Sequence, residues 1–564
     1  AAPSLRLNRL DNRLTSARIR GDCRETMRSD NVAITPSERL LRRSRSPDTT
    51  HASGLLALGI VVVVGAQAIG LYQFYDATAL ALAAVGLGVP AAWLLWKSPA
   101  VGLAILVFLT SGFVPAKALD LRLPVGGLDS RDLTLLGLAA LLGLRSQVRG
   151  QVTIPWRWTG IALVVFLALA VLSGLYAVLI MQVAPNWALS EFRTVVYYST
   201  FFLAALALQN RRQLVVLLVG LVLVADLTAG ALIVQQFFGR DAPVLAAMSG
   251  GTWNVWTAYQ GDPTLGNTQV LRIIPPGHVL TFVVSIVAFC FVLSERSGTL
   301  FRLFFAAQYA YLNLGLIFTY SRAQWIASAL AVFVVFILLP GQVRTRLIVY
   351  SIGTALALAV GFGVVYSIAQ EAFGASVLDA VQARASSILD PNATLGSNSL
   401  EWRIFENDRA VASIGAHPIF GVGLGAIYRA PTSLQGEDIW GIRDQYRLTR
   451  FVHDGYLYLA VKMGVIGLLS FLLFVGAVLW TGLTQRRHLT DQRLQAINLA
   501  LMASVVGLLL WAITQPQFLL TESTAIIGLV TGVIASVGRP ALAETPRRAS
   551  TPKGAAGHSL SVAR

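Results

Sequence analysis

Apolar segments of about 20 residues recur along most of the chain and alternate with short polar connections. Segments of this length can cross about 30 Å of hydrocarbon as helices, and they are too long for the strands of a membrane barrel. The pattern therefore predicts an all-α, polytopic integral membrane protein with 12 to 14 transmembrane helices. The stronger runs are residues 54–71, 78–96, 161–180, 214–234, 279–293, 323–339, 347–366, 465–480, 499–513 and 525–537, and the weaker ones are 101–113, 134–144, 195–208 and 304–318.

Composition agrees with a chain that needs lipid. Of its 564 residues, 55% are hydrophobic and 13% charged, about half the charged share of a typical soluble domain. Of the two cysteines, Cys23 lies before the first span and Cys290 inside one, so neither a disulfide framework nor a cysteine metal cluster is expected. The chain also contains no Asp-x-Asp pair, and this absence argues against a metal-dependent transferase that uses a sugar nucleotide as donor.

The net charge of +16 raises the question whether the protein binds nucleic acid, because eleven arginines lie within the first 52 residues. No aromatic residue accompanies them, and an arginine-rich segment directly before a first span is what the positive-inside rule predicts. A cytoplasmic tail that touches anionic lipid is the better interpretation, and no nucleic-acid partner is expected. The basic segment 539–564 is predicted to be a second cytoplasmic tail, and both tails are predicted to be disordered.

With both tails inside, alternate short loops carry the expected excess of Lys and Arg, although one loop assigned outside, residues 117–131, breaks the pattern. Five regions follow: the tail 1–52, an N-terminal bundle 53–300, a core 301–480, final helices 481–538 and the tail 539–564. Two long loops, 238–273 and 370–453, then face the periplasm, the second directly before the last three helices. Long loops usually carry function.

Aromatic and basic side chains gather on the predicted outer face. Trp253, Trp256 and Tyr259 in the first long loop suit either stacking on sugar rings or anchoring at the membrane interface. Arg193, Arg272, Arg322 and His453 lie outside or at the outer ends of spans. Arg322 occupies a tight outward connection, where a snorkelling structural arginine is one reading. Several converging guanidinium groups would alternatively suit a diphosphate, since each can donate two hydrogen bonds to phosphate oxygens.

Three motifs around the second loop resemble one family. They are Tyr-Ser-Arg-Ala-Gln-Trp at 320–325; Arg403 followed by Ala-His-Pro-Ile-Phe-Gly-Val-Gly at 416–423; and His-Asp-Gly-Tyr-Leu at 453–457 with Gly-Val-Ile-Gly-Leu at 464–468. In this order they resemble the O-antigen ligase and polymerase superfamily of the bacterial inner membrane, over roughly residues 301–474. The family has Asn where this chain has Asp454, which leaves the partner of His453 open.

The resemblance implies a GT-C-like fold and a metal-independent glycosyl transfer that needs no cofactor. A glycan would leave undecaprenyl diphosphate for the hydroxyl of a glycan or glycolipid acceptor at the periplasmic face. Arg322, with one or more of Arg193, Arg272 and Arg403, would stabilise the leaving diphosphate. His453 would orient or deprotonate the acceptor, with Asp454 or Asp408 as supporting carboxylates, although a purely structural histidine remains an alternative.

Other functions stay open at this point. A polymerase of O-antigen or exopolysaccharide repeats shares the donor with a ligase, and the motifs alone do not separate the two. The His453 segment and the long final loop most resemble the ligase, which is the expected type. A flippase or transporter of lipid-linked glycans would also use many spans and an outward cationic site, but the sequence shows no clear internal repeat. A scaffold for polysaccharide assembly is a third alternative.

Some residues admit a structural explanation. His417, before Pro418, predicts a turn, and Gly421 and Gly423 predict close backbone packing. Asp226, inside an apolar run, is either functional or bonded to a neighbouring helix. Lys462 and Glu522 lie near span ends, where snorkelling would explain them, and no role is assigned to them.

Overall fold

The computed structural model describes residues 93–114, 129–148, 158–238, 254–257, 271–294, 298–341, 343–345, 348, 375–389, 398–430 and 449–539. These residues form helices, apart from one short hairpin and the connecting turns. The elements are α4 Pro99–Thr110, α6 Ser130–Val148, α7 Trp158–Leu179, α8 Pro185–Val196, η1 Tyr197–Ser199, α9 Thr200–Ala207, α10 Arg211–Phe238, β1 Asn254–Thr257, β2 Leu271–Ile274, α12 His278–Val292, α13 Thr299–Ile317, α14 Arg322–Leu338, α16 Ala375–Leu389, α18 Asn398–Ala416, α21 Gly455–Arg486, α22 Gln492–Trp511, η2 Gln517–Leu519 and α23 Thr521–Val537.

Among the described residues, five helices are long and apolar enough to cross a membrane: α7, α10, α13, α21 and α22. The shorter helices α4, α12, α14 and α23 are also apolar. A helical membrane protein is therefore confirmed. The number of 12 to 14 spans stays a prediction, because run 54–71 lies outside the described residues and runs 78–96 and 347–366 lie largely outside them.

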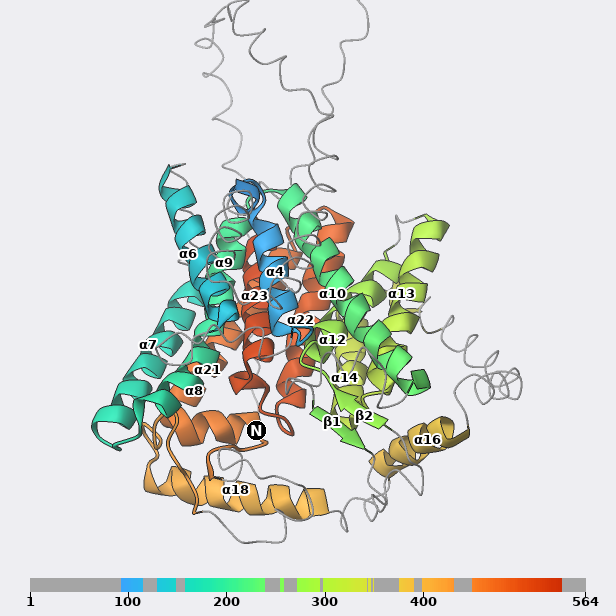
Figure 1. Ribbon diagram of the computed structural model, residues 1–564. Helices are drawn as coiled ribbons and strands as arrows, with labels where there is room; N and C mark the ends of the chain where they lie inside the picture. The colour runs from blue at the N-terminus through green and yellow to red at the C-terminus, as the bar shows by residue number, and fades with distance from the viewer. Residues whose placement is uncertain are drawn as a thin grey trace, which may run out of the picture. The chain divides into compact units, whose positions relative to one another are not determined.

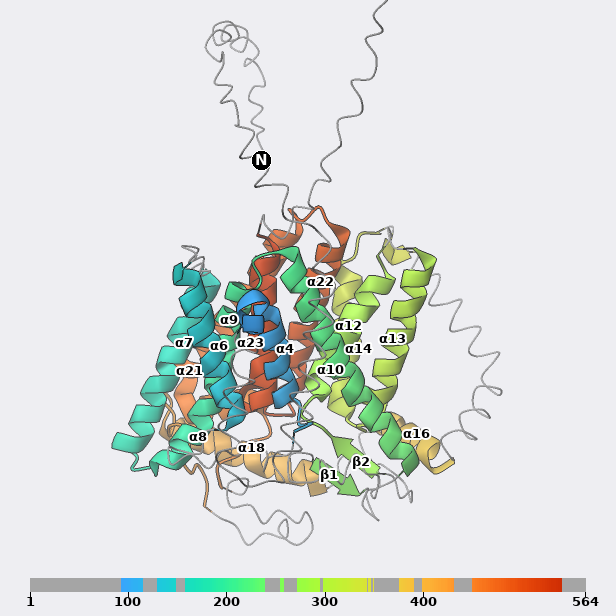
Figure 2. The ribbon, with the colours of Figure 1, turned by 45° about the horizontal axis from the view of Figure 1, so that its top comes forward.

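The helices differ in how much of their surface other helices cover. Every residue of α23 from Ser523 to Val537 is buried, and the most apolar window of α22 is 78% buried. The corresponding window of α7 is only 28% buried, so α7 presents apolar side chains outward, as a lipid-facing helix does. Figure 2 shows α22 and α23 between α6 and α7 on one side and α10, α12, α13 and α14 on the other.

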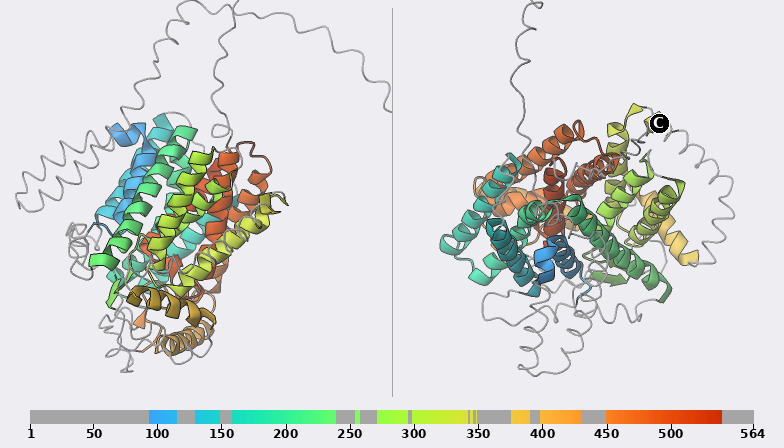
Figure 3. Two further views of the ribbon diagram at one scale, coloured as in Figure 1. Left: turned by 90° about the vertical axis from the view of Figure 1, so that its right-hand side faces the viewer. Right: turned by 90° about the horizontal axis from the view of Figure 1, so that it is seen from above.

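The non-spanning elements gather at one end of the bundle. Helices α16 and α18 and the hairpin lie there in two perpendicular views (Figures 1 and 3). The hairpin pairs β1 with β2 antiparallel, Asn254 opposite Ile274. The starts of α14 and α21 also lie at this end, so the two segments that carry Arg322 and His453 approach α16 and α18.

Basic residues that the sequence assigns to cytoplasmic loops lie at the other end of the same helices. Arg211 begins α10 and its Nη1 lies 2.8 Å from a carboxylate oxygen of Asp491, which caps α22. Arg486, in the last turn of α21, donates to the carbonyl of Leu338 at the end of α14. Which end faces the cytoplasm stays a prediction, as do the two tails, whose residues lie outside the described ranges.

Candidate active site

A buried carboxylate on α18 fixes the ring of His453. Glu406 Oε2 lies 2.6 Å from His453 Nδ1 and also accepts the backbone N–H of the same residue at 3.2 Å. A carboxylate at Nδ1 places the proton on that nitrogen, which leaves the lone pair on Nε2. The side chain of Glu406 is 1% exposed and that of His453 is 29% exposed, so the imidazole keeps an accessible side.

Glu406 also pairs with Arg429, which lies in the loop that follows α18. Arg429 Nη2 donates to Glu406 Oε1 at 3.1 Å, and the Arg429 guanidinium lies over the rings of Trp402 and Tyr428 at 4.7 and 5.3 Å. Burial alone would raise the pKa of Glu406, but the hydrogen bond and charge of His453, together with Arg429, hold it below its ordinary value. Glu406 is therefore an ionised carboxylate with two fixed partners.

Arg403 brings a second cation beside this carboxylate. It lies three residues before Glu406 on α18, a spacing that places both side chains on one face of the helix. Burial lowers the pKa of Arg403, the charge of Glu406 raises it, and the like charge of Arg322 lowers it. The charge of Arg322 therefore acts on Arg403, and a bound anion would offset the unfavourable interaction of these like charges.

Arg322 is held by α16. Its Nη1 donates to the hydroxyl of Ser387 at 3.2 Å. The preceding connection is bent, because Tyr320 has a φ of 49°, and its carbonyl accepts a hydrogen bond from Arg384 Nε at 3.1 Å. Helix α16 therefore fixes both the turn and the guanidinium that follows it.

The predicted turn at His417 is present and leads into a glycine segment. The backbone N–H of Gly421 donates to the His417 carbonyl at 3.1 Å, and Gly421, Gly423 and Gly425 all have positive φ. This segment fits into a break in α21 at Gly464, whose φ is 70°. The amide of Gly423 donates to the carbonyl of Lys462 at 3.1 Å, so the broken helix and the inserted loop satisfy each other's backbone groups. Close packing of Gly421 and Gly423 is confirmed.

Lys462 does not snorkel, contrary to the sequence interpretation. Its side chain is 0% exposed; Nζ donates to the carbonyl of Ala426 at 2.6 Å and lies 3.1 Å from Glu191 Oε1. The other carboxylate oxygen of Glu191 accepts the backbone N–H of Gly425 at 2.6 Å. The broken helix makes this burial possible, since the inserted loop supplies an acceptor for the buried ammonium group.

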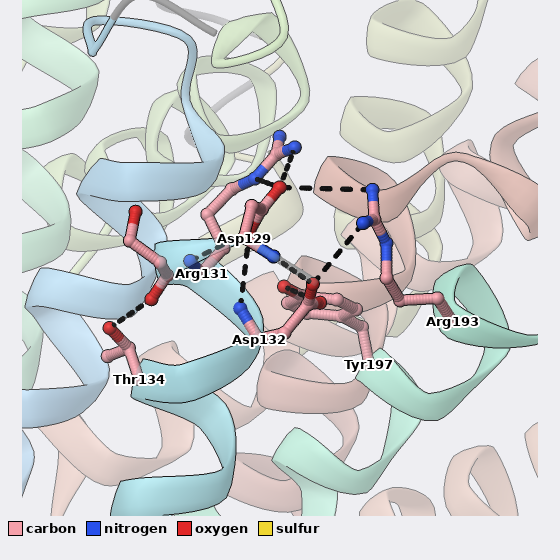
Figure 4. A network of polar contacts seen from close by, with 7 residues as sticks. Asp129, Arg131, Asp132, Thr134, Arg193 and Tyr197 are labelled. Atoms are coloured by element: carbon pink, nitrogen blue, oxygen red, sulfur yellow. Dashed lines mark hydrogen bonds and ion pairs between the residues drawn. The ribbon is translucent and has the colours of Figure 1, made fainter. Parts of the chain in front are cut away.

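Arg193 belongs to a separate polar network, drawn in Figure 4. Its Nη1 lies 3.3 Å from Asp132 and its Nη2 3.8 Å from Asp129, while the hydroxyl of Tyr197 donates to Asp132 at 2.9 Å. Burial would raise the pKa of Asp129, but the hydrogen bond and charge of Arg131, with the charge of Arg193, hold it below its ordinary value. The described contacts of Arg193 run to these carboxylates, and a role in diphosphate binding stays a prediction.

Of the remaining predicted positions, Arg272 and Trp256 lie in the hairpin. The backbone of Arg272 pairs with that of Trp256 in the antiparallel ladder, which brings these two positions side by side. Trp253 and Tyr259 lie outside the described residues. Roles for these four residues in diphosphate or glycan binding stay predictions.

Sequence reasoning missed Glu406 as the partner of His453. Asp454 instead caps α21, where its carboxylate accepts the backbone N–H groups of Tyr456 and Leu457 at 2.8 and 3.0 Å, and Asp408 is exposed on α18. The sequence signal that pointed to Glu406 was its spacing of three residues from Arg403, which places both side chains on one face of a helix.

Asp226 accepts a hydrogen bond from Gln308 of α13. This is the bond to a neighbouring helix that was one of its two predicted roles.

Within the described residues, no group of three or more His, Cys, Asp or Glu side chains is placed to hold a metal ion. Whether the reaction depends on a metal stays a prediction.

The apolar helix bundle, with polar elements at one end, defines a multi-pass membrane protein. A comparison with protein families matches residues 307–472 to the family described as O-Antigen ligase. This match confirms the resemblance to the O-antigen ligase and polymerase superfamily, glycosyltransferase-like membrane enzymes of polysaccharide biosynthesis that act on lipid-linked glycans and acceptors. The matched segment contains Arg322, Arg403, Glu406, Arg429 and His453. A search of curated proteins finds no match to the chain.

Proposed function

We propose that the protein transfers a glycan from undecaprenyl diphosphate to an acceptor hydroxyl at the outer face of the inner membrane, as a metal-independent ligase. The observation that carries this proposal is the contact between Glu406 and His453 beside Arg403 and Arg322. An oriented base and a group of interacting cations are what this transfer requires, and all four residues lie inside the family-matched segment.

His453 acts on the acceptor. Glu406 keeps the proton on Nδ1 and stabilises the imidazolium that forms, so Nε2 can accept the proton of the attacking hydroxyl. The acceptor oxygen forms a bond to the anomeric carbon as the bond from that carbon to the diphosphate oxygen breaks. The diphosphate leaves with the bonding electron pair.

Arg322 and Arg403 act on the leaving group. A diphosphate gains negative charge as the glycosidic bond breaks, and two guanidinium groups whose like charges act on each other are electrostatically suited to it. Ser387 holds Arg322 in place before substrate arrives. Positioned cations of this kind can stabilise the leaving group without a metal ion.

The test is to incubate the purified, reconstituted protein with undecaprenyl-diphosphate-linked glycan, first alone and then with candidate glycolipid acceptors, and to separate the products by gel electrophoresis. Transfer that requires a second acceptor supports the ligase. A ladder of lengthening glycans from donor alone would make the protein a polymerase with the same donor chemistry. Unchanged donor under all conditions, with movement of the intact lipid-linked glycan across the bilayer, would favour a flippase and overturn the proposal.

A further inference from the structure

A short segment of the loop that follows α18, residues 425–429, holds the carboxylate that fixes His453, and we call this segment the strap. Its last residue, Arg429, donates to Glu406 Oε1 at 3.1 Å, and the two side chains are only 2% and 1% exposed. A hydrogen bond between charged groups is about twice as strong as one between neutral groups. The position of Glu406 therefore depends on where the strap lies.

The residue before Arg429 holds the chain that leads to His453. The backbone N–H of Tyr428 donates to the carbonyl of Thr449 at 3.1 Å, and its hydroxyl donates to the carbonyl of Phe451, also at 3.1 Å. Phe451 lies two residues before His453, and its ring packs edge-on against the imidazole, with the ring centres 5.0 Å apart. Tyr428 is thus bonded to the backbone that carries the imidazole.

These two consecutive strap residues link the two halves of the pair. Arg429 bonds the carboxylate and Tyr428 bonds the histidine backbone, so a shift of the strap relative to either partner changes the contact of 2.6 Å between His453 Nδ1 and Glu406 Oε2. The backbone N–H of His453 donates to the same oxygen at 3.2 Å, so one displacement affects two hydrogen bonds. A misplacement of about 1 Å can cost an enzyme a hundred-fold in rate.

The near end of the strap is fixed to the helix bundle through Gly425. Its N–H donates to Glu191 Oε2 of α8 at 2.6 Å, and its carbonyl accepts a hydrogen bond from Arg450 Nε at 2.8 Å. Gly425 has a φ of 76°, and a Cβ there would lie 2.5 Å from the backbone nitrogen of Ala188, so the strap begins in close contact with α8. The Arg450 guanidinium lies over the ring of Trp187 at 4.3 Å, which holds it beside the same helix.

Glu191 connects this anchor to α21, the helix that begins two residues after His453. Its Oε1 accepts the hydroxyl of Tyr458 at 3.2 Å and lies 3.1 Å from Lys462 Nζ. Lys462 in turn donates to the strap, at the carbonyl of Ala426. A buried ion pair is costly to form and strongly destabilising to break, so this network fixes α8, α21 and the strap in one arrangement.

We infer that Tyr428 is a positioning residue for His453, and that Glu191 and Arg450 hold the strap where Tyr428 can act. The Tyr428 hydroxyl sets the backbone ahead of the imidazole, while the neighbouring Arg429 sets the carboxylate that the imidazole contacts. This inference rests on the function proposed above and adds residues that act on the proposed base without contacting substrate.

The test uses the full-length protein in lipid nanodiscs with the variants Tyr428→Phe and Arg450→Met. Tyr428→Phe keeps the ring and removes only the hydrogen bond to Phe451. Arg450→Met keeps an unbranched side chain but cannot donate to the carbonyl of Gly425. Tyr311→Phe is the matched control, because the Tyr311 hydroxyl of α13 also donates to a backbone carbonyl, at 2.9 Å, on α10. Melting temperatures identify any variant that is not folded.

Two measurements distinguish positioning from a general structural role. Solid-state NMR with isotope-labelled histidine, without substrate, reports which ring nitrogen of His453 carries the proton, and His453→Gln identifies its signals. Transfer from undecaprenyl-diphosphate-linked glycan to a glycolipid acceptor gives kcat and the KM of the donor. In Tyr428→Phe and Arg450→Met the Nδ1–H form should become a mixture of tautomers. Their kcat should fall about five-fold, the usual effect of losing one hydrogen bond, with an unchanged donor KM. Tyr311→Phe should match wild type in both measurements.

Wild-type tautomers and wild-type kcat in both test variants would overturn the inference. A raised donor KM with unchanged kcat would also overturn it, because the residues would then bind substrate rather than position His453. A loss of activity that Tyr311→Phe shares, in step with a lower melting temperature, would reduce the role of Tyr428 to folding alone and overturn it as well. Absence of transfer by the wild type would overturn the proposed function, and the NMR comparison would still decide whether the strap positions the imidazole.

Discussion

The Nδ1 nitrogen of His453 lies 2.6 Å from the carboxylate of Glu406, a side chain that is 1% exposed. The two residues are 47 positions apart and come from different elements, α18 and the segment that begins α21. A carboxylate buried this deeply is costly unless it is paired. Arg429 and His453 both pair with it, and the outcome is an imidazole with a fixed ring, whose Nε2 has no hydrogen bond to any residue that the structure describes.

Glu406→Gln should slow glycan transfer by about a hundred-fold or more, because the neutral amide no longer stabilises the imidazolium or fixes its tautomer. Donor binding should change little. The measurement is the rate of product formation at saturating donor, together with its pH dependence. Asp408→Asn is the matched control, since Asp408 is exposed on the same helix, and transfer by Glu406→Gln at the wild-type rate would exclude Glu406 as a positioning residue.

Much of the bundle and part of this site follow from local sequence. Apolar runs locate α7, α10 and α22 because the period and length of a span depend only on nearby residues. Arg322 and His453 are recognisable because short motifs surround them. Glu406 is not, because its role arises from a contact across 47 residues. The burial of Lys462 likewise depends on the break at Gly464 and on a loop inserted from residues 421–426.

Arg322→Lys should slow transfer by about a hundred-fold, because an ammonium cannot match the planar guanidinium in binding phosphate oxygens. The assay is transfer from undecaprenyl-diphosphate-linked glycan by protein that is inserted and folded. Arg344→Lys, at an exposed arginine beyond the other end of α14, serves as the control and should have no effect. Full activity of both Arg322→Lys and Arg322→Ala would remove Arg322 from the mechanism.

The stability of the protein should fall in acid partly through Glu406. Its pKa is lower in the folded state than in the unfolded chain, so the unfolded chain binds more protons as the pH falls. The stabilisation is present above the ordinary glutamate pKa, near 4.3, and is lost as the pH falls through the folded value. Melting temperatures between roughly pH 3 and pH 6 should show a shallower decline for Glu406→Gln than for wild type. Parallel curves would mean that other carboxylates dominate the acid response.

Lys462→Met should destabilise the protein by about 3 to 5 kcal/mol, because it leaves the buried carboxylate of Glu191 without its cation. The double variant Lys462→Met/Glu191→Gln should recover part of this loss, since a glutamine can still accept the backbone N–H of Gly425. Reversible unfolding in mixed micelles measures both. Equal stability of the single and double variants would show that the charge of Glu191 is not what makes Lys462 necessary.

Gly464→Ala should prevent the glycine segment from entering the break in α21. Gly464 has a φ of 70°, and an added Cβ would overlap the carbonyl of Ile419. The backbone conformation alone costs an alanine about 1 to 3 kcal/mol, and the overlap forces the inserted loop outward, where Ala426 and Gly425 can no longer pair with Lys462 and Glu191. Gly476→Ala, on the same helix with open space around it, is the matched control and should be neutral or slightly stabilising. Limited proteolysis and melting temperature should separate the two variants, and a Gly464→Ala protein as stable and protease-resistant as Gly476→Ala would mean that the break in α21 is not required for the fold.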